Sequence, residues 1–323
     1  MPATTTFPPS RGGWEKYEGN PVLGDAEMGT CFDVLVYPEY GGRLVPERPD
    51  LKPSGFRMYF SWRPKKSLAV TSSADGIVWR EPRIILGPDP TSGWEDDLNR
   101  NCVVEKDGIL HLWYTGQAHG NSWIGYATGV ADDRDDSGFI RVGREPVLVP
   151  EQPWEYMSVM NPCVLWDRDR GLFRMWYSAG ETYEPNVICY AESGDGVTWR
   201  KHRANPIVTA DKRNVYEQGR IGGCQVLPYR GGYLMFYIGY EDIDTARICG
   251  AWSPDGVSRW KRFPCNPIVS PEPGSWDGDA CYKPSVVYDA PTDRWLLWYN
   301  GRLKGDEYIG LAIHQGEDLG LGL

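Results

Sequence analysis

The chain has 323 residues, a net charge of −10 at pH 7, and 15 Trp, 38 Gly and 26 Pro residues. The acidic balance and scattered Lys and Arg argue against nucleic-acid binding, which requires basic clusters. No apolar run approaches the length needed to span a bilayer. The N-terminal segment has neither the basic start nor the apolar core of a signal peptide, so we expect a cytoplasmic protein.

A tryptophan followed by Asn-Pro and two branched apolar residues recurs along the chain. Three clear copies and two looser ones occur: Trp14–Leu23, Trp199–Val208, Trp260–Val269, Trp79–Leu86 and Phe139–Leu148. Regular self-similarity of this kind indicates a repeat architecture.

Three further short runs lie between successive copies of this phrase. They are β-branched or aromatic and are bounded by Gly, Pro or Asp, which is typical of strands. In the second repeat they are Cys102–Glu105, Leu110–Tyr114 and Trp123–Thr128. The phrase itself supplies a fourth, outer strand, and Asp-Gly pairs such as Asp75-Gly76 suit the tight turn before it.

The repeat has a period near 60 residues. The residues just before the first strands are Asp33, Asn101, Asn161, Gly223 and Lys283, spaced by 68, 60, 62 and 60 residues. Four strands in such a period make one propeller blade. The last repeat stops after its third strand, whereas Trp14–Leu23 is a fourth strand with no blade before it. We therefore predict an all-β, five-bladed β-propeller of four-stranded antiparallel blades, in which the N-terminal strand joins the last blade, over a single domain 1–323.

The eight cysteines and four histidines do not form a metal-binding pattern. No Cys-x-x-Cys pair is present and the histidines lack zinc spacing. Cys102, Cys163 and Cys224 fall on successive first strands, which suits small buried hydrophobic residues. No cofactor and no metal ligand are predicted.

In a propeller the inner strands line a central channel, so polar residues in the links and hairpins at one face should converge. Aromatic, amide and charged side chains gather in these segments. As substrate-binding candidates they give Trp62, Arg63, Arg100, Asn101, His119, Asn161, Glu181, Arg220, Asp279, Lys283 and Arg302.

Carboxylates, aromatic rings and amides around a cleft suit sugar chemistry. Cleavage of a glycosidic bond uses two carboxyl groups, one as acid and the other as base or nucleophile. The five residues just before the first strands form what we call the inner column. Asp33 is the only carboxylate among them, so we predict it as the base or nucleophile. Glu217 is the first choice for the acid, because its blade has only Gly223 in that column; Asp97 is a second catalytic candidate, with Asp279 and Glu181 as rivals.

The sequence resembles the five-bladed propeller glycoside hydrolases of families 43, 32 and 130. The resemblance rests on the NPVL and NPIV phrases, on S-x-D-G-x-x-W at Ser73–Trp79 and Ser193–Trp199, and on the closing WLLWYNGR and YIGLAIH stretches. It implies a propeller fold and a catalytic Asp on the first inner strand, a position that Asp33 matches. The chain departs from families 43 and 32 at Asn161-Pro162, where they carry Asp-Pro, and at Gly223, near their acid, and it lacks the Asp-Pro-Arg stretch of family 130.

The leading hypothesis is a glycosidase that acts on a small oligosaccharide. A glycoside phosphorylase or transglycosylase is the first alternative, with Arg100, Arg220, Lys283 and Arg302 as a phosphate-binding set. A non-catalytic carbohydrate-binding propeller is the second alternative, and the departures at Asn161 and Gly223 favour it. No nucleic-acid or membrane partner is expected.

Overall fold

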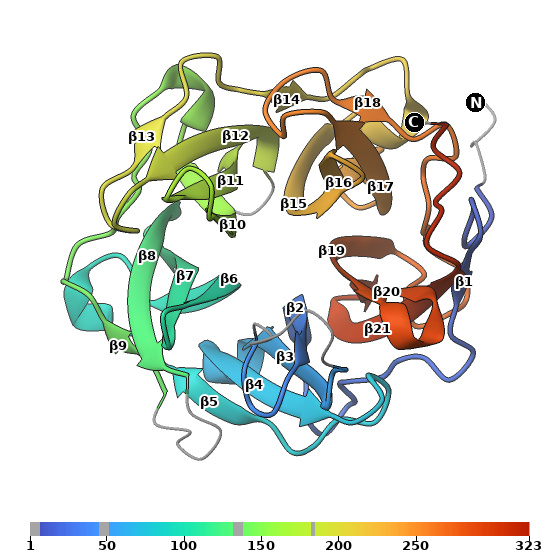
Figure 1. Cartoon of the computed structure of the whole chain (residues 1–323), viewed down its shortest axis with the longest axis horizontal. Coiled ribbons are helices and arrows are strands. Elements are labelled where there is room, and N and C mark those ends of the chain that lie inside the picture. The colour runs from blue at the N-terminus through green and yellow to red at the C-terminus, as the bar shows by residue number, and fades with distance from the viewer. Residues whose placement is uncertain (1–6, 45–51, 132–137, 182–184, 323) are drawn as a thin grey trace.

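The computed structural model describes residues 7–44, 52–131, 138–181 and 185–322. Its regular structure is strands with a few single-turn helices, grouped into meanders around a centre (Figure 1). Among the described residues, no helix is long and apolar enough to cross a membrane. The prediction of an all-β chain is confirmed.

Most of the strands form antiparallel meanders in chain order. The first sheet contains β2 (Cys31–Glu39), β3 (Gly55–Trp62), β4 (Ser67–Ser73) and β5 (Arg83–Leu86). Another contains β15 (Arg220–Tyr229), β16 (Gly232–Tyr240), β17 (Ala246–Ser253) and β18 (Lys261–Arg262).

A nine-stranded sheet holds two further meanders, which meet at one parallel bridge between Ser122 and Ser158. The first has β6 (Asp97–Lys106), β7 (Ile109–Ala118), β8 (Asn121–Val130) and β9 (Ile140–Arg141). The second has β10 (Ser158–Asp167), β11 (Leu172–Gly180), β12 (Pro185–Ser193), β13 (Arg200–Lys201) and β14 (Val208–Thr209).

The last sheet joins the two ends of the chain. It contains β19 (Ala280–Asp289), β20 (Arg294–Leu303), β21 (Asp306–Gln315) and, from the N-terminus, β1 (Trp14–Lys16). β1 is antiparallel to β21, with Trp14 opposite His314. The N-terminal tryptophan phrase therefore lies where a fourth strand belongs.

The first strand of every meander has a bulge with one residue in the left-handed region. These residues, with φ between 49° and 55°, are Asp33, Arg100, Asn161, Gly223 and Lys283. Such bulges re-aim side chains and are frequent beside active sites. The predicted column is thus off by one residue in the second repeat, where Arg100 and not Asn101 is equivalent to Asp33.

The asparagine of the Asn-Pro phrase pairs with the neighbouring strand through its side chain. The Asn266 amide accepts a hydrogen bond from Gly250 N at 2.8 Å and donates to Gly250 O at 2.9 Å. Asn20 makes the same two bonds with Leu311, and Asn205 makes them with Tyr190. The repeated phrase is therefore an architectural device that attaches the outer segment to the third strand.

Replacement of Asn266 by alanine should lower the free energy of unfolding by about 2 kcal/mol, because it removes two hydrogen bonds and leaves the N–H of buried Gly250 without a partner, although Gly250 O keeps its bond from Phe263 N. Urea denaturation measures this change. Asn121→Ala, at the start of β8 where the amide donates to His119 O in an exposed hydrogen bond, should change stability by less than about 0.5 kcal/mol. Equal effects of the two substitutions would contradict the architectural role.

The Ser-x-Asp-Gly turns join neighbouring meanders. Ser73 Oγ and Asp75 Oδ1 accept the backbone N–H groups of their own turn. The carbonyl of Gly76 accepts a hydrogen bond from Trp298 Nε1 on β20 at 2.9 Å, which links the last meander to the first. The carbonyls of Gly196 and Gly256 accept the same bond from Trp113 and Trp176.

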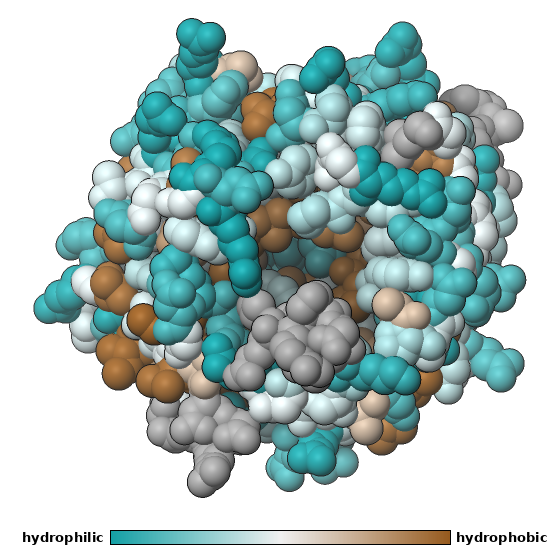
Figure 2. Space-filling model, in the orientation of Figure 1, coloured by the Kyte–Doolittle hydropathy of each residue, from teal (hydrophilic) through white to brown (hydrophobic). Residues whose placement is uncertain are grey.

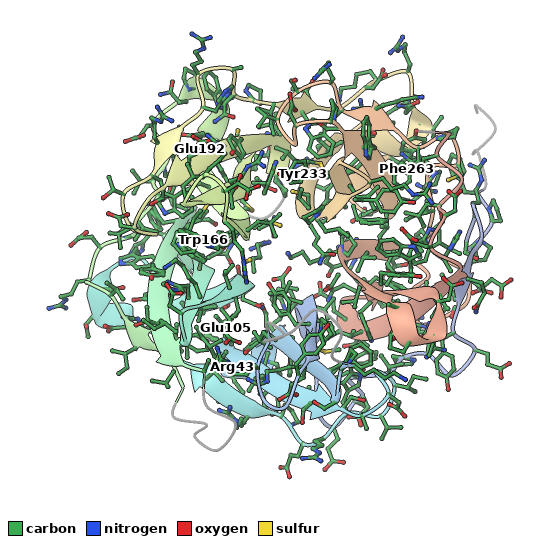
Figure 3. All side chains as sticks on the ribbon, in the orientation of Figure 1. Arg43, Glu105, Trp166, Glu192, Tyr233 and Phe263 are labelled. Carbon is green, nitrogen blue, oxygen red and sulfur yellow. The ribbon has the colours of Figure 1, made fainter. Side chains whose placement is uncertain are left out.

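A further contact between meanders lies at the end of β6. Figure 3 shows Arg43, from the segment after β2, beside Glu105 of β6, and the two side chains form an ion pair. Glu105 also accepts the Leu44 N–H at 2.7 Å. This carboxylate thereby anchors part of the β2–β3 connection; residues 45–51 of that connection lie outside the described ranges.

The cysteines on the inner strands are buried and free, as predicted. Cys102 Sγ accepts the N–H of Val164 at 3.1 Å and Cys163 Sγ accepts that of Val226 at 3.2 Å. Gln225 Oε1 and Ser285 Oγ accept the corresponding N–H groups of Val286 and Val36. Cys224 lies one residue earlier, inside its bulge, so the three cysteines do not share one position.

Candidate active site

Three of the five bulges, those of Asp33, Arg100 and Asn161, carry a polar side chain into a pocket of about 110 Å³, which we call the axial pocket. Its lining includes Asp33, Arg63, Arg100, Asn161, Arg302 and Glu307. These residues come from four of the meanders, so only the ring-like arrangement brings them together.

Asp33 is 3% exposed and lines the axial pocket. Its Oδ2 accepts hydrogen bonds from Arg100 N at 3.2 Å and from Ser61 Oγ at 3.3 Å. Its own N–H donates to Asn300 Oδ1 at 3.0 Å. Among the described residues, no donor bonds to Oδ1. The backbone and one carboxylate oxygen are therefore held, while the other oxygen is left for a molecule in the pocket.

Two guanidinium groups flank Asp33. Arg63 lies over the Phe32 ring at 4.2 Å and pairs with Glu307 at 3.2 Å. Arg100 donates to Asn99 Oδ1 at 2.8 Å, and the Asn99 amide donates to Gln117 Oε1 at 2.7 Å. These contacts fix the positions of the polar side chains around the pocket.

Asp97 begins β6, opposite Gln117 in the strand register. Burial raises the pKa of the Asp97 carboxyl above its ordinary value, and nearby Asp33 adds to this, although Arg63 and Arg100 oppose the shift. A raised pKa favours the protonated form, which a general acid needs. Asp97 is not among the residues that line the axial pocket, whereas its strand neighbours Asn99 and Arg100 do line it.

Glu217 lies elsewhere, and this corrects the first choice of acid. Its side chain is fully buried and accepts hydrogen bonds from Tyr237 OH at 2.5 Å and from Arg262 Nε and Nη2, both at 2.8 Å. It does not line the axial pocket.

The same clamp recurs in three other meanders: an acid before the first strand binds a second-strand tyrosine and a base from the outer strand. The sets are Glu95–Tyr114–Arg141, Glu155–Tyr177–Lys201 and Asp277–Tyr299–Lys16. Lys16 comes from β1, so the N-terminal strand supplies the base of the last clamp. Glu217 is therefore part of the architecture.

Several predicted substrate-binding residues do not line the axial pocket. Trp62 donates its indole N–H to Met28 O, His119 is exposed at a turn, and Glu181 pairs with Arg220 at 3.1 Å. Asn101 and Lys283 line a separate cavity of about 130 Å³ among the inner strands. Asn101 follows the bulge residue of β6, whereas Lys283 is itself the bulge residue of β19, so a bulge alone does not bring a side chain into the axial pocket.

Asp279 lines a third, larger cavity, together with Arg302. Its Oδ2 accepts the Lys304 N–H at 2.6 Å.

Figure 2 shows one face of the ring, which is mostly hydrophilic and is hollowed at its centre.

Sequence reasoning missed Glu307 and Tyr282, which also line the axial pocket. Burial and the neighbouring Glu307 carboxylate raise the pKa of Tyr282 well above its usual value, so the phenol stays protonated. Glu307 stands directly opposite Arg302 in the β20–β21 register. Glu307 could have been predicted from the sequence as the residue across the β20–β21 hairpin from the candidate Arg302.

Within the described ranges, no group of three or more His, Cys, Asp or Glu side chains is placed to hold a metal ion. What the axial pocket offers is carboxylates, amides and guanidinium groups.

A scan of known protein families finds none that matches the chain. The uncharacterized protein Rv1502 of Mycobacterium tuberculosis (strain H37Rv) is 28% identical over 278 residues, which cover 80% of this chain and 87% of that protein. A second M. tuberculosis protein, the uncharacterized MT1551 of strain CDC 1551, is 29% identical over 276 residues, with the same coverage.

Solved structures share the fold at low sequence identity. A glycoside hydrolase is 16% identical with a TM-score of 0.72, over 92% of this chain and 91% of that one. A thermostable family-43 glycoside hydrolase is 17% identical with a TM-score of 0.68, over 90% and 91%. A structure described under the GH130 family of mannoside phosphorylases and glycoside hydrolases is 15% identical with a TM-score of 0.69, over 97% of both chains. The chain therefore has the fold of the propeller glycoside hydrolases.

Proposed function

We propose that this protein is a glycosidase, with Asp33 as the base or nucleophile in the axial pocket. The observation that carries the proposal is the Asp33 carboxylate, which is buried in the pocket and bonded by described residues at Oδ2 only. The fold shared with carbohydrate-active enzymes supports it.

Asp97 is the proposed general acid. It does not itself line the axial pocket, but, unlike Glu217, it lies close enough to Asp33, Arg63 and Arg100 for their charges to act on its carboxyl group. It would protonate the leaving oxygen, while Asp33 either removes a proton from the attacking water or attacks the anomeric carbon itself. Burial of Asp97 favours its protonated form. Glu307 is assigned to positioning, because it is engaged by Arg63 and by Tyr282.

Asp97 should give the pH–rate profile its alkaline limb. Because the pKa of Asp97 is raised in the folded protein, the acid form persists to higher pH, and the rate should fall as pH rises through that pKa. Asp97→Asn should lower kcat about 100-fold and remove this limb.

The same shift predicts the effect of pH on stability. For this group, stability is greatest at low pH and declines as pH rises from the unfolded to the raised folded pKa. The variant should lose this decline in a series of denaturation curves. An unchanged alkaline limb in Asp97→Asn would remove Asp97 from the mechanism.

A panel of aryl furanosides and pyranosides, assayed with wild type and with Asp33→Asn, tests the proposed function. Release of the aryl group by wild type and its absence in the variant are expected. If no glycoside in the panel is cleaved, or if the variant cleaves equally well, the proposal is wrong.

Phosphorolysis is a second candidate, favoured by the guanidinium groups of Arg63, Arg100 and Arg302 around the axial pocket. Guanidinium groups match the geometry of phosphate oxygens. Running the same panel with and without phosphate, and analysing the product for sugar 1-phosphate, separates the two reactions.

We further propose that the five meanders are five blades of one closed ring that forms a single domain. The Lys16–Asp277 pair, the Trp298–Gly76 bond and the Ser285–Val36 bond support this interpretation, because each joins parts of the chain more than 200 residues apart. A closed ring explains how Asp33 and Glu307 reach one pocket.

A further inference from the structure

A groove of about 890 Å³ lies next to the axial pocket, and we call it the side groove. Its walls include Phe7, Arg247, Pro273, Asp279, Arg302 and Lys304. Arg302 and Asp244 line both cavities, and Arg302 Nη2 donates to Asp244 O at 2.6 Å between them. The two cavities therefore adjoin at Arg302 and Asp244, and a glycan with one end in the axial pocket would reach the side groove by passing these two residues.

The difference in size between the two cavities indicates which part of a substrate each one would hold. The axial pocket, at about 110 Å³, is on the scale of one sugar ring, whereas the side groove is several times larger. Phe7, Pro271 and Pro273 offer apolar surfaces, and sugar faces pack on such surfaces. The side groove is thus suited to the leaving-group part of the substrate.

The cations of the side groove point to an anionic ligand. Three cationic side chains and two carboxylates line it, although the whole chain has a net charge of −10. Among the described residues, no carboxylate lies within ion-pair distance of Lys304, and the Arg302 guanidinium bonds only to a carbonyl oxygen. One of the two carboxylates, Asp279, is engaged by the Lys304 N–H at 2.6 Å.

Arg247 gives a second, independent indication. It is 7% exposed and lines the groove, and its guanidinium lies 5.0 Å from the centre of the Phe7 ring. Its Nη1 pairs with Glu241 at 2.6 Å, but its buried Nε has no partner among the described residues. A buried donor without an acceptor is costly, and a bound anion nearby would offset part of that cost.

We infer that the side groove binds a carboxylate or phosphate group carried by the leaving-group part of the glycan, and that Lys304 and Arg302 recognise it. The inference rests on the proposed function only because it calls this part of the glycan the leaving group. It makes the substrate an acidic oligosaccharide, either a uronic acid-containing or a phosphorylated one.

Calorimetry on the full-length protein tests this inference with three probes: methyl glucuronide, glucose 6-phosphate and methyl glucoside. At least one anionic probe should bind about tenfold more tightly than methyl glucoside, a difference equivalent to about 1.4 kcal/mol. Which anionic probe binds distinguishes a carboxylate from a phosphate ligand. Raising NaCl from about 50 mM to about 300 mM should weaken that binding, since salt screens exposed charges.

Lys304→Gln should weaken the anionic probe about fivefold and leave methyl glucoside unchanged. Arg259→Gln, at an exposed cation outside the side groove, is the matched control and should change neither. Lys304 is exposed, so the variant should keep the wild-type unfolding temperature. Equal binding of all three probes, or an anion preference that survives in Lys304→Gln, would overturn the inference.

The aryl glycoside panel keeps the two proposals apart. Aryl monosaccharides need only the axial pocket for cleavage. If they are cleaved but calorimetry shows equal binding of the three probes, the side-groove inference is rejected and the glycosidase proposal is kept. Anion binding without cleavage of any glycoside would reject the glycosidase and keep the binding site.

Discussion

Asp33→Asn should lower kcat by about 10³-fold or more on whichever glycoside the wild type cleaves, because the amide can neither accept a proton nor attack the substrate. The substitution is nearly isosteric. Its side-chain oxygen can still accept the hydrogen bonds from Arg100 N and Ser61 Oγ. Folding should therefore be preserved, with the unfolding temperature within about 2 °C of wild type.

The matched control is Asp289→Asn, at the far end of β19. Asp289 is also buried, at 9% exposure, and bonds to Thr292 near the β19–β20 turn, away from the axial pocket. It should leave kcat within about twofold of wild type. Steady-state kinetics on both variants decide the matter: full activity in Asp33→Asn would remove Asp33 from catalysis.

Arg262→Ala should cost about 3 kcal/mol or more of unfolding free energy, the largest stability effect we expect. Removing one partner of a buried ion pair leaves an uncompensated charge inside the protein. Glu217 is fully buried and, of the donors in the described part of the chain, would keep only the Tyr237 hydroxyl and the Asp211 N–H. Urea denaturation at neutral pH measures the loss.

Arg213→Ala is the control for this effect. Arg213 pairs with Asp211 at 2.7 Å, but its side chain is 90% exposed, and exposed pairs contribute about 1 kcal/mol at most. The folded Arg262→Ala protein should keep wild-type kcat, because the clamp lies outside the axial pocket. A loss of kcat at unchanged stability would return Glu217 to the list of catalytic residues.

The Glu217 error shows what the repeats can and cannot tell. An aromatic residue directly followed by an acid marks each clamp in the sequence: Trp94-Glu95, Trp154-Glu155, Tyr216-Glu217 and Trp276-Asp277. The structure shows that the partners of Glu217 are Tyr237 and Arg262. The partner residues lie 20 and 45 positions away, so the spacing of one motif does not reveal them. Glu217 was favoured as the acid because Gly223 has no side chain and was expected to leave space in the channel. The structure shows that Ile238 occupies this space, since its Cδ1 would lie only 2.5 Å from a Cβ added at Gly223.

The sequence by itself determined the strand order, the place of β1 beside β21, the burial of the inner cysteines and the position of Asp33, because these follow from periodic local patterns. Only the tertiary structure decided that Arg100 is equivalent to Asp33, that Glu217 belongs to a clamp, and that Glu307 shares a pocket with Asp33. The physical reason is that a bulge shifts side chains by one residue. In addition, a ring brings together residues whose separation along the chain carries no information about their distance.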